Sequence, residues 1–241
     1  MKALAKNILK KTPGLLRLLH TVQNDKPFIT RRIEGIFSKK DKVFFVQVGS
    51  NDGLHGDPLN KLARYNSKYT GILIEPVKYA FEQLKSNYGN EDRFIFCNRA
   101  VSDGPSRKFY YVSSDAKKEI PNLPEWWNQL GSFDRNHIVK HLDGKLEPYI
   151  IEDQVRCSTL SEILVEHKVD KIDFLHVDTE GADLAVLKTM DFSTSLPTGV
   201  LYEKKHLSTE DAAEAKHMLI EQDYKIFDYK DDVLGIQRSA I

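Results

Sequence analysis

Hydrophobic residues along the chain occur in two patterns, as continuous runs and at the spacing of an amphipathic helix. Apolar, β-branched and aromatic runs at Val43–Val48 and 70–74 predict strands that are buried on both faces. Segments 58–66 and 77–88, which follow these runs, have the spacing of helices with one apolar face. This alternation predicts a parallel sheet with helices on both sides, an α/β fold.

The same alternation continues toward the C-terminus. Ser208, followed by Glu210 and Asp211, is the expected N-cap of a last long helix. Segments 224–229 and 233–237 form an expected hairpin at the sheet edge. Further strands are predicted at 94–100, 107–112, 172–177 and Gly199–Glu203, and further helices at 159–167 and 182–190.

One segment, from about residue 113 to 154, lacks this periodicity. It collects prolines, aromatic residues and histidines. A long insertion of this kind is typical of a lid or a platform for a substrate. Its notable members are Pro121, Pro124, Trp126, Trp127, Phe133, His137 and His141.

Length and composition favour one domain. A chain of 241 residues with 41% hydrophobic residues can bury one large core, which we place in residues 41–241. Residues 1–40 form a predicted helical appendage in which apolar and basic positions interleave. Charges and Pro13 interrupt its apolar stretches, so it is neither a secretory leader nor a transmembrane segment. Such a segment could pack on its own domain, dock a partner or make peripheral contact with a membrane.

Charge and cysteine content narrow the classes of partner. Lys and Arg together number 35, as do Asp and Glu, so no overall field favours nucleic acid as a partner. Cys97 and Cys157 lie far apart and have no metal-ligand spacing. We expect both to be small buried residues on strands, in a protein of the reducing cytoplasm.

The first candidate site lies where the strand Val43–Val48 ends. Gly49 and Gly53 let the backbone approach a ligand closely, and Glu75 at the end of the next strand could accept two ribose hydroxyls. Ser50, Asn51 and Asp52 stand between the glycines, which departs from the dinucleotide fingerprint. The pattern favours a nucleoside ligand without a pyrophosphate.

Asp52 indicates the charge of that ligand. Its carboxylate would repel a pyrophosphate and tolerate a cation. S-adenosylmethionine has a sulfonium, an ammonium and a ribose diol, and it carries no phosphate. Two interpretations remain beside it: a nucleotide-sugar-binding oxidoreductase or transferase on a Rossmann-like sheet, and a non-catalytic scaffold that binds S-adenosylmethionine or nothing.

A second set of acidic residues follows later strands. Asp178 and Glu180 come after the strand 172–177, and Glu203 and His206 come at the end of the next one. The carboxyl ends of parallel strands share one crevice, so these side chains should face Gly49 and Glu75. They could act as a general base, hold the donor's ammonium or bind Mg²⁺ or Mn²⁺. Asp183 is more simply explained as a helix-start residue.

The ordered set of motifs resembles the FkbM-type family of S-adenosylmethionine-dependent methyltransferases over about residues 43–237. This resemblance implies a class I methyltransferase fold, a Rossmann-like three-layer sandwich with a mostly parallel seven-stranded sheet and an antiparallel C-terminal hairpin. It also implies methyl transfer to oxygen on a sugar, a glycan or a secondary metabolite. The motifs are residues 46–53, 56–59, 71–76, 100–102, 131–133, 158–160, 172–183, 202–203 and 206–207.

The resemblance also assigns roles to residues. Gly49 to Gly53 would surround the methionine part of the donor, Glu75 would bind its ribose, and 98–100 would border its adenine. Gly56-Asp57-Pro58 departs from the family pattern, in which a small hydroxyl residue follows the glycine turn. The predicted donor-binding residues are Gln47, Gly49, Ser50, Asn51, Asp52, Gly53, Glu75, Pro76, Asn98, Ala100 and Asp178. The predicted catalytic residues are Asp178, Glu180 and Glu203, and the predicted acceptor residues are Trp126, Trp127, Ser132, Phe133, His137 and His206.

Overall fold

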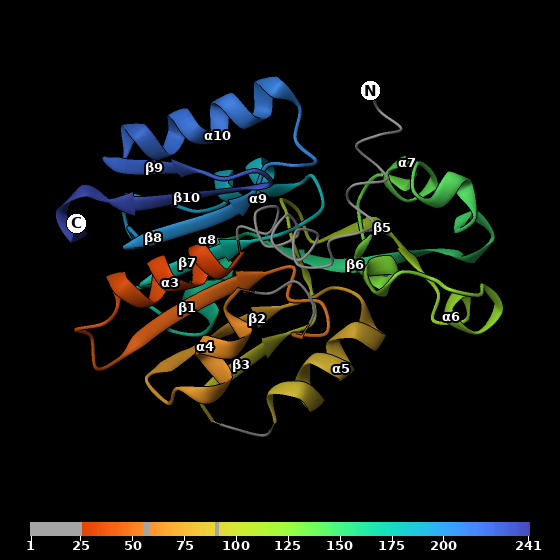
Figure 1. Ribbon diagram of the computed structural model, residues 1–241, viewed down its shortest axis with the longest axis horizontal. Coiled ribbons are helices and arrows are strands. Elements are labelled where there is room, and N and C mark those ends of the chain that lie inside the picture. The colour runs from red at the N-terminus through yellow and green to blue at the C-terminus, as the bar shows by residue number, and fades with distance from the viewer. Residues whose placement is uncertain (1–25, 55–57, 90–91) are drawn as a thin grey trace, which may run out of the picture.

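A computed structural model describes residues 26–54, 58–89 and 92–241 of the chain. Its centre is a seven-stranded sheet with the strand order β3-β2-β1-β7-β8-β10-β9 (Figure 1). Neighbouring strands are parallel except β10, which is antiparallel to β8 and β9. This confirms the predicted sheet and its C-terminal hairpin. The strands are β1 (Val43–Val48), β2 (Tyr69–Ile74), β3 (Phe94–Cys97), β7 (Phe174–Val177), β8 (Gly199–Glu203), β9 (Tyr224–Asp228) and β10 (Asp232–Gln237).

Helices cover both faces of this sheet and make the fold a three-layer sandwich. Successive residues of a strand point to opposite faces, and β1 shows this directly. Phe45 packs in a buried cluster with Ile29 of α3, whereas Val46 packs in a second cluster with Ile163 of α8. One face holds α3 (Lys26–Ile36), α4 (Asn60–Tyr65) and α5 (Lys78–Tyr88), and the other holds α8 (Leu160–Glu166), α9 (Asp183–Lys188) and α10 (Thr209–Glu221). A short 3-10 helix, η4 (Arg238–Ala240), ends the chain.

The structure corrects two details of the expected strands. The strand expected at 94–100 is divided, because β3 ends at Cys97 and β4 (Ala100–Val101) belongs to a second sheet. That sheet has the order β4-β6-β5, with β5 (Ser106–Val112) and β6 (Ile150–Ser158). β6 begins inside the segment expected to be irregular. Most of its side chains are exposed, so its sequence shows little apolar alternation, and its pairing with β5 and β4 makes it a strand.

Residues between β5 and β6 form a small lobe of short helices with a core of its own. This core includes Val112, Trp127, Ile138 and Leu146. The lobe lies beside the main sheet in Figure 1, and its role as a lid stays a prediction. Its elements are α6 (Ala116–Glu119), η1 (Glu125–Gln129), α7 (Arg135–Val139), η2 (Leu142–Gly144) and η3 (Glu147–Tyr149).

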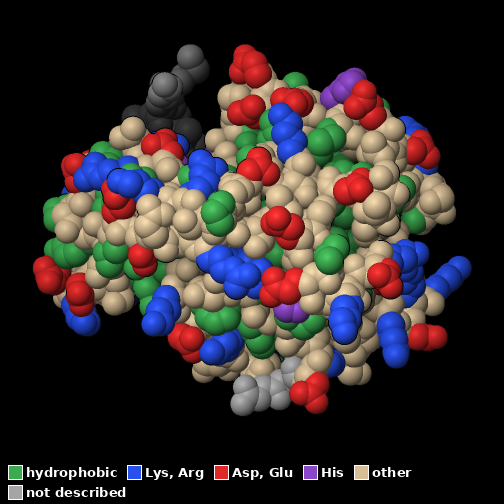
Figure 2. Space-filling view, turned by 180° about the vertical axis from the view of Figure 1, so that it is seen from behind, with side chains coloured by type: hydrophobic (Ala, Val, Ile, Leu, Met, Phe, Trp, Pro, Cys, Tyr) green, Lys and Arg blue, Asp and Glu red, His purple; other side chains and the backbone are tan. Residues whose placement is uncertain are grey.

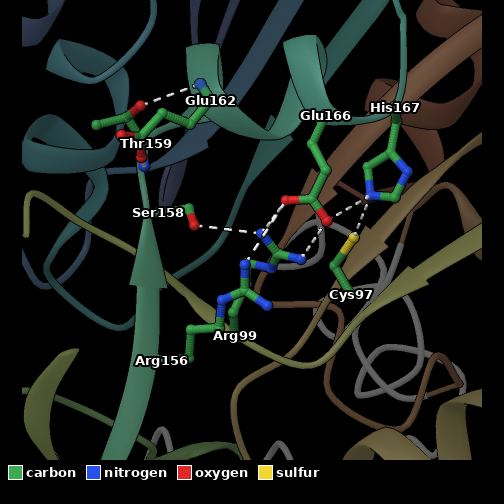
Figure 3. Close-up of polar contacts among 8 residues, drawn as sticks. All are labelled: Cys97, Arg99, Arg156, Ser158, Thr159, Glu162, Glu166 and His167. Atoms are coloured by element: carbon green, nitrogen blue, oxygen red, sulfur yellow. Dashed lines mark hydrogen bonds and ion pairs between the residues drawn. The ribbon is translucent and has the colours of Figure 1, made fainter. Parts of the chain in front are cut away.

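A polar cluster links the second sheet to α8 (Figure 3). Arg99 donates two hydrogen bonds to the Glu166 carboxylate, at 2.7 and 2.8 Å, and a third to Ser158 Oγ. This bidentate pair holds the pKa of Glu166 at about 2. Cys97 Sγ lies 3.3 Å from His167 Nε2, but burial raises the pKa of its thiol to about 11. The thiol therefore stays protonated and is no activated nucleophile.

Several smaller expectations are also settled. Cys97 and Cys157 are free and buried on strands, and Ser208 caps α10 by accepting a hydrogen bond from the Asp211 backbone N–H. The predicted N-terminal appendage lies, up to residue 25, outside the described residues. Within the described ranges, no helix has the length and apolar character needed to cross a bilayer. Figure 2 shows acidic and basic side chains intermixed over one face.

Candidate active site

The turn after β1 brings backbone from three strands together. Gly49, Asn51 and Gly53 all have positive φ, at 78°, 46° and 71°. The backbone N–H groups of Gly49 and Ser50 both donate to the carbonyl oxygen of Ile74, at 3.0 Å. A Cβ atom on Gly49 would lie 1.8 Å from the carbonyl oxygen of Asp178. Only glycine therefore fits at position 49, where β1 and β7 end side by side.

Glu75 lies buried beside this turn. Its carboxylate accepts hydrogen bonds from the backbone N–H groups of Asn51, at 2.9 Å, and Val77, at 2.8 Å. Burial raises the pKa of Glu75 to about 7 in spite of these two bonds. An ionised carboxylate offers about four acceptor positions, so two remain for a ligand diol. Asn98 donates from its amide to the carbonyl oxygens of Glu75 and Pro76 and so holds the loop in place.

Carboxylates line the neighbouring strand ends. Burial, followed by repulsion from Asp178 and Glu180, raises the pKa of Glu203. Asp183 is fully buried and accepts hydrogen bonds from Thr179 Oγ1, at 3.1 Å, and from the Glu203 backbone N–H, at 3.2 Å. These bonds tie the loop after β7 to β8, so Asp183 supports the site from behind.

Glu180 faces two histidines. Its Oε2 atom lies 3.2 Å from His137 Nε2 and 3.1 Å from His206 Nε2. Burial opposes ionisation of Glu180, but the contacts with these histidines outweigh it and lower its pKa. Burial lowers the pKa of His206 to about 4, so its imidazole is neutral at pH 7. Glu180 itself has a φ of 54°, a backbone conformation that few residues other than glycine adopt.

These parts open onto one cavity of about 440 Å³. That volume lies within the roughly 300–1,000 Å³ typical of small-molecule sites. It extends from the glycine turn and Glu75 to the carboxylates, with the helical lobe on its other side. The predicted residues that line it are Gln47, Gly49, Ser50, Asn51, Glu75, Pro76, Ala100, Trp126, Phe133, Asp178, Glu180, Glu203 and His206.

Two predicted donor-site residues lie behind the cavity wall, in addition to Asn98. Asp52 is buried and accepts a hydrogen bond from the Leu54 backbone N–H, which stabilises the turn. Gly53 packs so tightly against α5 that an added Cβ would lie 2.6 Å from Leu84 and 2.7 Å from Tyr88. Both residues thus shape the turn from behind.

Three predicted acceptor residues also lie outside the lining. Trp127 is buried in the lobe and stacks on Tyr79, and Ser132 Oγ accepts a hydrogen bond from the Asp134 backbone N–H. His137 is buried behind Glu180. Trp126, which does line the cavity, is 40% exposed.

The cavity also contains residues that sequence reasoning did not select. Asn128 accepts a hydrogen bond at its carbonyl oxygen from the Asn51 side chain, at 3.0 Å, and so joins the lobe to the glycine turn. His141 lies in the aromatic-rich insertion, which was the only signal for it. Other lining residues come from β5, from the lobe, from the loop after β8 and from the β9–β10 turn with the start of β10, and no local pattern marks them. They include Phe109, Leu130, Lys205, Asp231 and Asp232.

The strand order, the antiparallel β10 and a nucleoside-sized site at the carboxyl ends of β1 and β2 define a class I methyltransferase fold. The family model described as the methyltransferase FkbM domain matches residues 47–227, more than half of the chain. The chain therefore belongs to the FkbM methyltransferase family, and its class is S-adenosylmethionine-dependent methyltransferase. No curated protein matches it.

Among solved structures, three similar ones illustrate the range of distant matches. The Methanococcus jannaschii fibrillarin pre-rRNA processing protein has 14% identity and a TM-score of 0.45, over 89% of this chain and 76% of that one. A SAM-dependent O-methyltransferase from Thermotoga maritima has 10% identity and a TM-score of 0.44, over 93% of this chain and 71% of that one. A precorrin-6y C5,15-methyltransferase from Geobacter metallireducens has 7% identity and a TM-score of 0.43, over 87% of this chain and 88% of that one. These values are too low to carry an argument about this chain.

Proposed function

We propose that the protein transfers the methyl group of S-adenosylmethionine to a hydroxyl oxygen of a sugar, a glycan or a secondary metabolite. The observation that carries this proposal is the single cavity that joins Glu75 and the glycine turn to the carboxylate-lined strand ends. A donor and an acceptor hydroxyl can meet in such a cavity without leaving it. The acceptor is a small molecule or a glycan and not a nucleic acid, because the chain has no excess of basic residues.

The donor's orientation follows from the chemistry of the cavity wall. Glu75 accepts the two ribose hydroxyls, and Ala100 borders the adenine. The amino-acid part lies along the turn at Gly49 and Asn51, which both line the cavity. The sulfonium methyl then points toward Asp178.

In the reaction, the acceptor oxygen attacks the methyl carbon in line with the carbon–sulfur bond. A carbon–oxygen bond forms, the carbon–sulfur bond breaks, and its electron pair stays on the sulfur of S-adenosylhomocysteine. Asp178 receives the hydroxyl proton as general base. Most of the acceleration comes from holding the two reactants in line.

Trp126 and Phe133 form the platform for the acceptor. Both line the cavity from the lobe side, and the half-exposed Trp126 ring offers a flat apolar surface. The C–H faces of sugars pack well on such rings.

We place the reaction in the cytoplasm, because the cysteines Cys97 and Cys157 are both free and suit a reducing compartment.

Calorimetry with unlabelled ligands tests the donor assignment. We expect S-adenosylmethionine and S-adenosylhomocysteine to bind with micromolar dissociation constants, and NAD and UDP-glucose to show no binding at the same concentrations. Tight binding of NAD or UDP-glucose, with no binding of the two S-adenosyl ligands, would overturn the proposal in favour of a nucleotide-sugar enzyme.

Asp178→Asn tests the proposed base. The amide keeps the size of the side chain but takes up no proton, so we expect turnover to fall by about 10²–10⁴-fold while donor affinity changes little. S-adenosylhomocysteine release from a panel of sugars and phenolic or polyketide-like alcohols measures turnover. Asp103→Asn, at an exposed position, is the matched control. Unchanged turnover in Asp178→Asn would rule out its role as base.

A further inference from the structure

Three histidines meet on the lobe side of the cavity, beyond the proposed position of the donor. His137 comes from α7, His141 follows the same helix, and His206 comes from the loop after β8. Their ring centroids lie 4.9 Å apart for His137 and His141, 4.9 Å for His137 and His206, and 5.9 Å for His141 and His206. Two elements far apart in the sequence thus place imidazole groups around one point.

Glu180 reaches the same point from the loop after β7. Its Oε2 atom is 3.2 Å from His137 Nε2 and 3.1 Å from His206 Nε2, and all three atoms are buried. Among the described residues none of these three atoms has a hydrogen-bond partner, since the contacts are close but not directed as hydrogen bonds. Buried polar atoms without partners are rare, because each costs free energy. Their convergence indicates a ligand that binds all three.

The separations match the spacing of ligand atoms around a metal ion. A tetrahedral zinc site with bonds of about 2.0–2.1 Å places its ligand atoms about 3.3–3.4 Å apart. The two measured separations from Glu180 fall within a few tenths of an ångström of that value. We propose that His137 Nε2, His206 Nε2 and the Glu180 carboxylate bind a divalent transition-metal ion such as Zn²⁺.

Neighbouring groups support this arrangement. His141 Nδ1 lies 2.6 Å from the carbonyl oxygen of His137. A carbonyl only accepts, so Nδ1 carries a proton and Nε2 of the neutral ring is left as an acceptor. One ring nitrogen of His141 lies within 4.8 Å of a ring nitrogen of His137 and of His206. A ring nitrogen bound to a backbone carbonyl is the usual orientation device around protein-bound metals. The positive φ of Glu180, at 54°, is a strained conformation that directs its carboxylate to the histidines.

The donor atoms decide which ion fits. Imidazole nitrogens with one carboxylate suit zinc, iron or cobalt, whereas Mg²⁺ and Mn²⁺ prefer oxygen ligands. The oxygen-rich site expected from the sequence included Asp178. Ligand atoms instead lie within 4.8 Å of one another in two groups, His137 with His141 and His206, and Glu180 with Glu203 and His206. The proposed ligands therefore favour an ion that accepts nitrogen over the Mg²⁺ or Mn²⁺ expected from the sequence, which stays a prediction.

The ion has a function within the proposed reaction. Three protein ligands leave a fourth position of a tetrahedral ion for another oxygen, and His206 and Glu180 both line the cavity. An acceptor hydroxyl bound there would lose its proton more easily, because the ion stabilises the alkoxide. This role rests on the proposed function, with Asp178 still receiving the proton, whereas metal binding itself does not depend on it.

Titration of tag-free, chelator-treated protein with Zn²⁺, Co²⁺ and Mg²⁺ tests the site. We expect calorimetry to show one Zn²⁺ or Co²⁺ per chain, competition between the two ions, and no comparable binding of Mg²⁺. Bound Co²⁺ should also show the intense visible absorption of a four-coordinate ion. His206→Ala and Glu180→Gln should each weaken Zn²⁺ binding by at least about 100-fold. Mutation of a residue that only supports a metal ligand typically costs about 10–100-fold, and removal of a ligand itself should cost no less.

His217→Ala is the matched control, because the His217 side chain is 71% exposed on α10, lies beside Glu221 and does not line the cavity. Circular dichroism confirms that each variant is folded, and S-adenosylhomocysteine affinity is measured in parallel. Absence of stoichiometric Zn²⁺ or Co²⁺ binding, or binding that survives in both His206→Ala and Glu180→Gln, would overturn the metal site. If the wild type does not bind S-adenosylhomocysteine, the proposed function is overturned instead. Failure of the metal site and failure of the proposed function are therefore distinguishable.

Discussion

Glu75→Gln is expected to weaken S-adenosylmethionine binding by about 100-fold or more. The carboxylate already accepts hydrogen bonds from the backbone N–H groups of Asn51 and Val77. In the proposed function its remaining acceptor positions take the two ribose hydroxyls. Glutamine has a single acceptor oxygen, and its NH₂ group would face one of those backbone donors. Hydrogen bonds to a charged group contribute about 1.5–3 kcal/mol each. Loss of two exceeds the roughly 2.8 kcal/mol that correspond to 100-fold.

Calorimetry on wild type, Glu75→Gln and the control Glu82→Gln measures this effect. Glu82 lies on α5 with its side chain 57% exposed, so the same chemical change there should leave the affinity unaltered. An unchanged dissociation constant in Glu75→Gln would show that Glu75 does not bind the ribose.

The raised pKa of Glu75 also predicts that donor affinity depends on pH. Burial raises the pKa of Glu75 to about 7, so a ligand that needs the ionised form must displace a proton below that pH. We expect the affinity difference between wild type and Glu75→Gln to grow as the pH rises from 6 to 8. The comparison cancels the donor's own titration, and a difference that does not vary with pH would contradict the assignment.

The stability of the ligand-free protein should change in the opposite direction. The folded state holds the Glu75 proton up to about pH 7, whereas the unfolded chain releases it near pH 4.5. Protonated Glu75 therefore contributes stability that is fully present below about pH 4.5 and is lost as the pH rises through 7. Urea unfolding of the wild type between pH 5 and 8 checks the sign.

Gly49→Ala is expected to lower the unfolding free energy by more than about 4 kcal/mol, in the range that marks a specific structural fault. Positive φ alone costs an alanine about 1–2 kcal/mol. The larger part comes from the collision of the new Cβ with the Asp178 carbonyl, 1.8 Å away, which can be relieved only by separating the ends of β1 and β7. Donor binding should be lost together with stability, because these strand ends form the cavity wall.

Gly104→Ala separates the two effects. Gly104 has nearly the same φ, 79°, but no atom lies within 4 Å of its added Cβ. Urea denaturation should therefore show a loss of only about 1–2 kcal/mol for Gly104→Ala, the effect of positive φ by itself. Equal losses in the two variants would mean that the close approach at Gly49 has no special role.

Periodicity and end signals were enough to predict most of the main sheet. The apolar runs at β1, β2, β7 and β8 are buried on both faces, so their residues report burial without any long-range information. Glu75 and Asp178 could be placed at one edge for the same reason, since the carboxyl ends of parallel strands converge.

Strand β6 and the helical lobe could not be predicted in this way. The exposed side chains of β6 show little apolar alternation, and its identity as a strand depends on pairing with β5 and β4. Gln129 and Leu130 reach the cavity because the lobe folds back over the sheet around its own core. Such packing depends on contacts between segments distant in sequence, which no local pattern records.

The sequence by itself determined the sheet, the donor-side turn and the family pattern, because strand burial and tight turns are encoded in neighbouring residues. Only the tertiary structure decided that His137, His206 and Glu180 meet at one point, or that Asp52 and Gly53 support the turn from behind. The physical reason is that α7, the loop after β7 and the loop after β8 converge through long-range packing. Distances between side chains on such separate elements are set by the folded core and not by the spacing of residues along the chain.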